Sequence, residues 1–220
     1  MMKLIVFDVD GTLVDSQNMI LTALETTFKL HGLSVPKKEQ RLATIGLSLP
    51  DGIKFLKPEL KQEQIFQIVE DYKDSFFNIR ANLNGKPEGP IYMGVRKLLY
   101  QLSVRDDVIL GIATGKALVG LQYTLKSHGL THFFSNFQTS DFHPSKPDPR
   151  MLEAAILETG SINEGTVMIG DTTFDMEMAV AAGTRKIGVS WGYHSAKKLK
   201  SAGADLIVDS CDQISDAIDT

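Results

Sequence analysis

Lys3-Leu-Ile-Val-Phe-Asp-Val-Asp-Gly-Thr12 begins with a lysine and four apolar residues and then carries two carboxylates separated by one residue. A short, uninterrupted apolar run is typical of a strand that is buried on both faces of a parallel sheet. The glycine after the second carboxylate lets the chain turn sharply. We therefore expect a strand over residues 3–7, with Asp8 and Asp10 directed into one pocket at its carboxyl end.

Similar apolar runs recur along the chain and alternate with helical patterns. We expect further strands at residues 108–113, 167–169, 186–189 and 206–208, and a weaker one at 133–138. Helical patterns lie between them at residues 95–102, 118–128, 149–159, 175–182 and 196–201. Strand followed by helix, repeated, predicts an α/β protein with a doubly wound, Rossmann-like parallel sheet.

The alternation is interrupted over residues 17–83, where no strand pattern occurs. A helical face at i, i+3, i+4 and i+7 spacing is formed by Ile65, Ile68, Val69, Tyr72 and Phe76, and a less regular one by Met19, Ala23, Phe28 and Leu30. The stretch 84–90 is rich in glycine and proline and predicts a hinge. We interpret residues 17–83 as an inserted all-helical cap domain, and residues 1–16 and 84–220 as the α/β core domain.

The composition is that of an ordinary globular protein. The 220 residues are 43% hydrophobic and 23% charged, and 23 basic against 27 acidic side chains leave a net charge of -4. This balance gives no reason to expect nucleic acid as a partner, although it leaves a local basic patch open. Cys211 is the single cysteine, and no segment is apolar for long enough to cross a bilayer. We expect a cytoplasmic protein without a membrane partner.

A second acidic pair, Asp171 and Asp175, follows the predicted strand at 167–169. The carboxyl ends of parallel strands share one edge of the sheet, where α/β proteins bind their ligands. Together with Asp8 and Asp10, these acids would repel one another unless a cation lay between them. Oxygen ligands favour a hard cation, and the sequence therefore predicts a Mg²⁺ site.

Two further strand ends supply a hydroxyl and a cation to the same edge. Thr114-Gly115-Lys116 offers a hydroxyl and backbone N–H groups to a phosphate, and Lys146 offers a compact positive charge. Each feature has a simpler interpretation: a solvated turn at Asp8, a helix cap at Thr114, a surface lysine, or a first-turn acid at Asp175. Their occurrence in order at successive strand ends favours one phosphoryl-transfer site.

These four motifs resemble those of the haloacid dehalogenase superfamily, and the helical segment resembles its phosphoglycolate phosphatase-like group. The resemblance extends over essentially the whole chain and implies a phosphatase with a helical cap. It implies that Asp8 is the nucleophile, which forms an aspartyl phosphate, and that Asp10 is the acid and base. It also implies that Thr114, Gly115 and Lys146 bind the phosphoryl group. The implied metal ligands are Asp8, Asp10 through its carbonyl, Asp171 and Asp175, the last directly or through another group.

The resemblance leaves several activities open. Asp10 favours phosphate ester chemistry over dehalogenation. A small phosphorylated metabolite such as phosphoglycolate is the expected substrate; pyrophosphate or nucleotide hydrolysis is the alternative. Mutase relatives carry a cap histidine near Ile20 and an arginine near Gly46, and this chain has neither. A non-catalytic binding protein is opposed by the complete motif set. The loop 46–52 resembles a substrate-selecting cap loop, and Trp191 and Tyr193 are expected to serve packing. A monomer and a homodimer are both compatible with the sequence.

Overall fold

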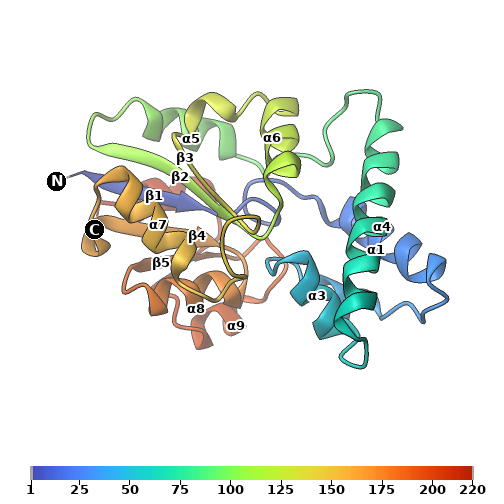
Figure 1. The fold of residues 1–220 in the computed structure, drawn as a ribbon. Coiled ribbons are helices and arrows are strands. Elements are labelled where there is room, and N and C mark those ends of the chain that lie inside the picture. The colour runs from blue at the N-terminus through green and yellow to red at the C-terminus, as the bar shows by residue number, and fades with distance from the viewer. Residues whose placement is uncertain (1, 220) are drawn as a thin grey trace.

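A computed structural model describes residues 2–219 and contains one parallel six-stranded sheet (Figure 1). The strands are β1 (Lys3–Phe7), β2 (Val108–Thr114), β3 (Asn136–Thr139), β4 (Thr166–Gly170), β5 (Arg185–Val189) and β6 (Leu206–Val208). Their order across the sheet is β3-β2-β1-β4-β5-β6, and every pairing is parallel. The predicted doubly wound α/β fold is confirmed.

Helices cover both faces of this sheet because the central strands are apolar on both sides. Ile5 and Phe7 of β1 contribute to one hydrophobic cluster, and Leu4 and Val6 contribute to the cluster on the opposite face. Successive side chains of a strand point to opposite faces, so a four-residue apolar run requires two covering layers. The layers comprise α5 (Val95–Ser103), α6 (Leu118–Ser127), α7 (Arg150–Thr159), α8 (Thr173–Ala181), α9 (Ala196–Ser201) and α10 (Cys211–Ala217).

Three details of the prediction need correction. The strand expected at 133–138 begins at Asn136, because Thr131–Phe133 forms a 3-10 turn first. Helix α8 begins at Thr173 rather than Asp175, since the Thr172 hydroxyl caps it. Helix α10 was not predicted; it is seven residues long and too short for a clear helical period.

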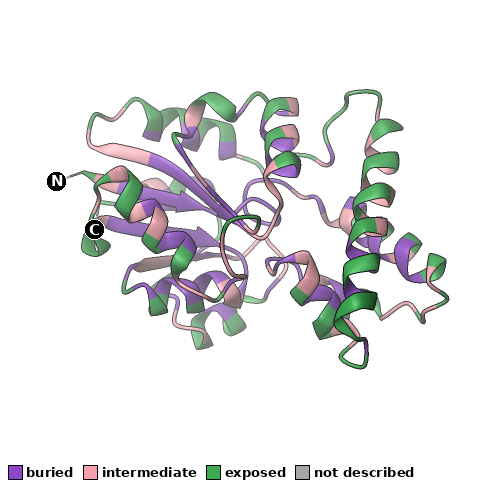
Figure 2. Cartoon of the chain, viewed as in Figure 1, coloured by how far each residue is buried: buried purple, intermediate pink, exposed green. Residues whose placement is uncertain are grey.

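The segment between β1 and α5 is helical and extends away from the sheet (Figure 1). It contains α1 (Gln17–Leu30), α2 (Lys38–Leu42), α3 (Leu49–Leu56) and α4 (Gln62–Ala81). A separate cluster centred on Ile53, Ile65 and Ile68 holds α3 against α4. Figure 2 shows buried positions on the inner side of this helical layer and exposed ones on its outer side. The domain limits of 17–83 stay a prediction.

One predicted core position in the helical segment is wrong. Met19, Ala23 and Phe28 of α1 are buried as expected, but Leu30 is 67% exposed. Leu30 is the last residue of α1, where the chain turns away at His31. In the part of the chain that the structure describes, no helix has the length and apolar character needed to span a membrane.

Candidate active site

Asp8 lies at the centre of the sheet edge where the strand order reverses. Its backbone N–H donates to the Ile169 carbonyl at 2.9 Å, which joins the end of β1 to the end of β4. Strands β2 and β4 flank β1 on opposite sides, so the chain after β1 lies at the crevice where doubly wound sheets bind ligands. The position of Asp8 follows directly from this topology.

Asp8, Asp171 and Asp175 converge on one point at this edge. Carboxylate oxygens from the three residues lie within 4.8 Å of one another, and all three side chains are buried. Lys146 Nζ lies 2.9 Å from Asp8 Oδ1 and 2.6 Å from Asp175 Oδ1. Lys146 is 1% exposed, so it is a buried cation between two buried anions and not a surface lysine.

The two later carboxylates are held by hydrogen bonds from neighbouring loops. Asp171 accepts from the Thr12 hydroxyl at 3.0 Å and from the Tyr193 backbone N–H at 2.8 Å. Asp175 Oδ2 accepts from the Thr172 N–H at 3.0 Å and from the Thr172 hydroxyl at 2.7 Å. Gly11 makes room for Asp171: its φ is +92°, and a Cβ there would lie 2.6 Å from the Asp171 carboxyl carbon.

Burial and mutual repulsion perturb the charges of this cluster. Burial raises the pKa of Asp8 to about 7; Lys146 opposes the increase, and Asp175 and Asp10 add to it. Burial, followed by the charges of Asp8 and Asp175, raises the pKa of Asp171 well above its ordinary value. Burial alone would lower the pKa of Lys146, but Asp175 and Asp8 outweigh it and hold that pKa above its usual range. Lys146 is therefore an ammonium group at neutral pH.

The acidic cluster fits a hard divalent cation. Both carboxylate oxygens of Asp8 are buried, and no well-aligned hydrogen bond from residues 2–219 reaches either of them. Lys146 supplies one positive charge to three carboxylates, so a negative excess remains. Buried anions without partners are costly, and an oxygen-only donor set suits Mg²⁺. The donor chemistry thus agrees with a metal site at Asp8 and Asp171.

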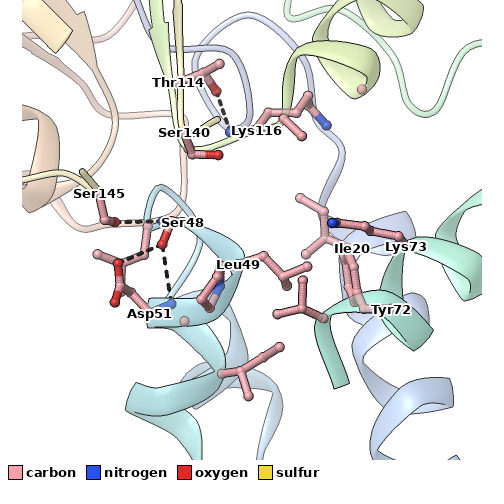
Figure 3. Close-up of a pocket in the computed structure, with 18 of the residues that line it drawn as sticks. Ile20, Ser48, Leu49, Asp51, Tyr72, Lys73, Thr114, Lys116, Ser140 and Ser145 are labelled. Atoms are coloured by element: carbon pink, nitrogen blue, oxygen red, sulfur yellow. Dashed lines mark hydrogen bonds between the residues drawn. The ribbon is translucent and has the colours of Figure 1, made fainter. Parts of the chain in front are cut away.

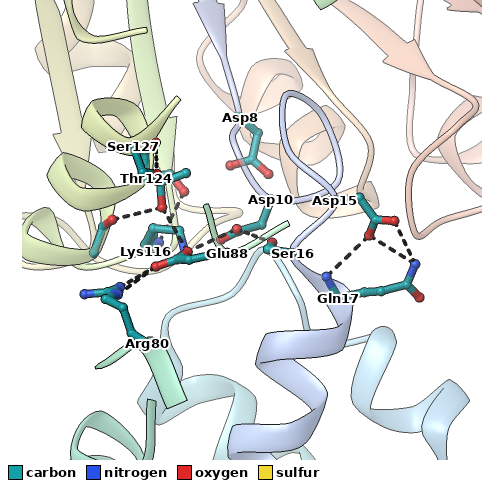
Figure 4. A network of polar contacts seen from close by, with 12 residues as sticks. Asp8, Asp10, Asp15, Ser16, Gln17, Arg80, Glu88, Lys116, Thr124 and Ser127 are labelled. Atoms are coloured by element: carbon teal, nitrogen blue, oxygen red, sulfur yellow. Dashed lines mark hydrogen bonds and ion pairs between the residues drawn. The ribbon is translucent and has the colours of Figure 1, made fainter. Parts of the chain in front are cut away.

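Asp10 belongs to a second polar network, which reaches into the helical segment (Figure 4). Its Oδ1 accepts a short hydrogen bond from the Ser16 hydroxyl and lies 3.2 Å from Lys116 Nζ. Lys116 also lies 3.5 Å from Glu88 Oε2, and Glu88 Oε1 accepts from Arg80 Nε of α4 at 2.9 Å. Burial alone lowers the pKa of Lys116, but Asp10 and Glu88 raise it above its usual value.

Thr114 and Gly115 lie where the core meets the loop before α3. The Thr114 hydroxyl accepts from the Lys116 N–H at 3.2 Å, and the residue that caps α6 is Ala117, so Thr114 is not the helix cap. A Cβ on Gly115 would lie 2.6 Å from the Gly46 carbonyl oxygen and would also collide with the Leu47 carbonyl. Gly115 therefore permits a close approach between core and loop.

The loop 46–52 covers the site from the other side (Figure 3). The Ser48 N–H donates to the Ser145 hydroxyl at 2.7 Å, next to Lys146 in the chain. The Ser48 hydroxyl accepts from the Asp51 N–H at 3.3 Å and caps α3. This loop therefore serves both as a helix start and as a cover over the carboxyl ends of the strands.

Gly115→Ala is expected to lower kcat/KM by about 10- to 100-fold and to lower the melting temperature, because the added Cβ would displace the backbone of the loop and misplace bound substrate. The measurement is steady-state phosphate release together with a thermal melt. Gly111→Ala is the matched control: it lies in β2 away from the pocket, where an added Cβ meets its nearest neighbour, Leu4 Cδ1, at 3.5 Å, an ordinary contact. Equal kcat/KM for both variants would contradict a need for glycine at position 115.

The loop and the strand ends enclose a pocket of about 760 Å³. Asp8, Asp10, Thr114, Gly115 and Ser145 line its core side. Helices α1, α3 and α4 supply the opposite wall, where Ile20, Leu49 and Tyr72 face into the space (Figure 3). The volume lies within the range that holds a small organic ligand.

Sequence reasoning did not identify Ser16, Arg80 or Glu88. None of the three lies in a recognised motif. Only Glu88 had a feature that could have indicated a role, because it is the one acidic residue in the predicted hinge. Trp191 packs against the core as expected. In addition, Trp191 Nε1 donates to the Thr12 carbonyl at 3.1 Å, and the Tyr193 N–H donates to Asp171. Both are therefore polar supports of the loops that carry the carboxylates.

An α/β sheet whose central strand ends carry a buried aspartate, a buried lysine and an acidic cluster that could hold a cation is suited to phosphoryl-transfer hydrolysis. Residues 5–189 match the family model for haloacid dehalogenase-like hydrolases, and the chain belongs to this family.

Curated relatives match nearly the full chain. A Dickeya dadantii protein named "Probable phosphatase IndB" is 34% identical over 97% of this chain and 92% of its own length. A pyrophosphatase, PpaX, from Oceanobacillus iheyensis is 29% identical over 94% of this chain and 92% of its own. A Vibrio cholerae phosphoglycolate phosphatase is 27% identical over 94% of this chain and 92% of its own.

The solved structures agree with these relatives. A haloacid dehalogenase-like family hydrolase from Streptococcus pneumoniae has a TM-score of 0.82 at 27% identity and covers 98% of both chains. The resemblance stated from the motifs is therefore confirmed, and the protein is a phosphatase of the phosphoric monoester hydrolase class.

Proposed function

We propose that this phosphatase is a magnesium-dependent cytoplasmic enzyme that hydrolyses a small phosphorylated metabolite through an aspartyl phosphate on Asp8. The observation that carries the proposal is the buried Asp8 carboxylate, which borders the pocket, pairs with Lys146 and has no other strong donor. A carboxylate oxygen at a ligand pocket that no described residue engages, such as Asp8 Oδ2, is suited to attack phosphorus.

In the first step, an Asp8 oxygen attacks phosphorus and the ester P–O bond breaks. The electron pair of that bond goes to the leaving alcohol oxygen, which takes a proton from Asp10. Thr114 and the backbone at Gly115 border the space that the phosphoryl oxygens would occupy, and Lys146 balances charge beside the nucleophile. These assignments agree with the roles that the motifs predict.

In the second step, Asp10 takes a proton from water, the water oxygen attacks phosphorus, and the bond to Asp8 breaks to release inorganic phosphate. The two steps need Asp10 in both protonation states. Ser16 and Lys116 both engage Oδ1 of Asp10, and Oδ2 receives no hydrogen bond from residues 2–219. The Oδ2 atom is therefore the position at which the transferred proton is carried.

Asp8, the Asp10 carbonyl and Asp171 would hold Mg²⁺, which supplies charge neutralisation for the phosphoryl oxygens. Asp175 was predicted as a direct ligand or as one acting through another group. Its Oδ1 is engaged by Lys146 and its Oδ2 by Thr172, so we assign Asp175 the task of holding Lys146 beside Asp8. The cover formed by residues 46–52 would exclude water during the first step.

The alternatives differ in what the same residues would act on. Pyrophosphate or nucleotide hydrolysis would use the same strand-end residues and differ only in the leaving group. A phosphomutase is less favoured because the pocket presents the apolar Ile20 in the region where mutase relatives carry a histidine. A non-catalytic binding protein would have no use for a complete set of nucleophile, acid and buried lysine.

Removal of magnesium is expected to abolish phosphate release and its return to restore it. Asp8 must be deprotonated to bind a cation, and its pKa of about 7 lies above the value of about 4 in unfolded chains. The metal-free fold thus loses stability as pH rises from about 4 to about 7, and magnesium reverses that loss most fully above pH 7. We expect the half-saturating Mg²⁺ concentration to be higher at pH 6 than at pH 8.

The measurement is phosphate release from phosphoglycolate, sugar phosphates, nucleotides, pyrophosphate and an activated aryl phosphate, with a chelator control and a Mg²⁺ titration at both pH values. Release that persists in chelator would contradict the proposed metal dependence. A complete lack of release from every compound would favour the non-catalytic alternative.

A further inference from the structure

The pocket wall opposite Asp8 is apolar and partly aromatic. It is formed by helices α1, α3 and α4, and its side chains include Ile20, Leu49, Ile53, Val69, Tyr72 and Phe76. The Tyr72 and Phe76 rings lie 5.7 Å apart at an interplanar angle of 31°. A wall of this kind stabilises apolar or flat groups by burial and ring contact, and its aliphatic and phenyl groups offer no charge to a carboxylate.

The cations at the pocket are already paired. Of the lysines and arginines among the described residues that line it, Lys116 faces Asp10 and Glu88, Arg80 faces Glu88, and Lys73 Nζ lies 2.6 Å from Glu70. Glu88 is fully buried at its side chain, so drawing Arg80 or Lys116 away from it would take from a buried anion one of its two cations. Lys116 and Arg80 are therefore not free to meet a second anion on a substrate, and of the lysines and arginines in the described lining only Lys73, whose exposed pair with Glu70 is weak, could do so.

Acidic side chains outnumber these cations. The pocket is also lined by Asp51, Asp74 and Asp141, in addition to Asp8 and Asp10. A divalent cation bound at the phosphoryl end would not offset the charges of these three further acids. A leaving group with its own negative charge would enter a region that carries a negative excess. Such a group would also give up part of its hydration, with only Lys73 as a cationic partner.

Tyr72 offers the wall one neutral polar group. Burial raises the pKa of its hydroxyl above its usual range, and Asp10 and Glu88 add to that increase. The phenol therefore stays protonated and can donate to a neutral oxygen or nitrogen. This combination of rings, aliphatic side chains and one hydroxyl matches a neutral ring-bearing alcohol.

We propose that the substrate is a phosphomonoester whose leaving group is uncharged and carries an apolar or aromatic ring, and not an acid such as glycolate or a second phosphate. This inference rests on the proposed phosphatase function and specifies its substrate class. The expectation of a phosphoglycolate-like ester stays a prediction, and the lining of the pocket argues against it.

The test compares two esters that differ only in charge. We would measure kcat/KM with Mg²⁺ for phenyl phosphate and for 4-carboxyphenyl phosphate, with phosphoglycolate as a third substrate. The carboxylate makes the phenol a slightly better leaving group, so intrinsic reactivity works against the expected order. We expect phenyl phosphate to exceed both acids by about tenfold or more, a difference of about 1.4 kcal/mol in transition-state binding.

A charge placed on the wall should change this order. Ile20→Lys adds a cation where Ile20 faces the pocket, and we expect it to reduce the preference for phenyl over carboxyphenyl phosphate by about tenfold. Leu157→Lys is the matched control, because Leu157 is 83% exposed on α7 and does not line the pocket. This substitution changes the net charge of the protein by the same amount as Ile20→Lys. We expect the control to leave the ratio unchanged.

Three results are distinguishable. A preference for the uncharged ester that Ile20→Lys alone weakens supports the inference. Magnesium-dependent hydrolysis with equal or better use of 4-carboxyphenyl phosphate or phosphoglycolate overturns it and leaves the phosphatase function intact. No magnesium-dependent release from any ester, including an activated nitrophenyl phosphate, overturns the proposed function and this inference with it.

Discussion

Asp8→Asn is expected to lower the rate of phosphate release by about 10⁴-fold or more, because an amide cannot form the covalent bond to phosphorus. The fold should persist. Asp8 is buried with a pKa raised to about 7, so the neutral amide removes an anion that the metal-free fold holds unfavourably at pH 8. The measurement combines turnover with a thermal melt in chelator, in which the variant should melt at the same temperature as the parent or higher.

The control for this experiment is Asp106→Asn, which makes the same change of charge at an exposed position. It should keep full activity. Intact turnover by Asp8→Asn would show that Asp8 is not the nucleophile. A strongly lowered melting temperature would instead show that Asp8 stabilises the fold as an anion, contrary to the direction of its pKa.

Lys146→Met is expected to abolish detectable turnover and to lower the free energy of unfolding by about 3–5 kcal/mol. The substitution leaves the buried carboxylates of Asp8 and Asp175 without their shared cation. Lys186→Met is the control, because Lys186 pairs with a partly exposed Asp205 at 3.1 Å and its loss should cost less than about 1 kcal/mol. The measurement is chemical denaturation in chelator, followed by assay of the folded variant.

A double variant separates the two roles of Lys146. Lys146→Met with Asp175→Asn removes one of the two unpaired anions, so the double variant should recover part of the lost stability while turnover stays absent. Recovery of activity in the double variant would contradict a direct role of Lys146 at the phosphoryl group. Equal stability of Lys146→Met and the parent would contradict the buried ion pair as a stabilising feature.

Most strand positions along the chain and the placement of Asp8, Asp171 and Asp175 at one sheet edge could be predicted from local sequence. Each apolar run is short and is followed by small, polar or acidic residues, and parallel strands bring their carboxyl ends to one edge. The same reasoning placed Thr114 and Lys146 at that edge. It failed for α10 and for the start of β3, where the segments are too short to show a period.

The network of Asp10, Lys116, Glu88 and Arg80 could not be predicted in this way. Glu88 lies 28 residues before Lys116 and 8 after Arg80 in the numbering, and no local pattern indicates that a hinge acid would be fully buried between two cations. Pairing of this kind depends on how α4 packs over the core. The pairing in turn decides which cations remain available to a substrate.

By itself the sequence determined the fold class, the family motifs and the identity of the residues at the strand ends, because these depend on hydrophobic period and on chain order. Only the tertiary structure decided that Gly115 meets the loop at Gly46, that Asp175 is already engaged by Lys146 and Thr172, and that the pocket wall is apolar with its cations paired. The physical reason is that burial and charge pairing are properties of side chains brought together from distant segments. The local sequence of one segment does not indicate which distant segment it will contact.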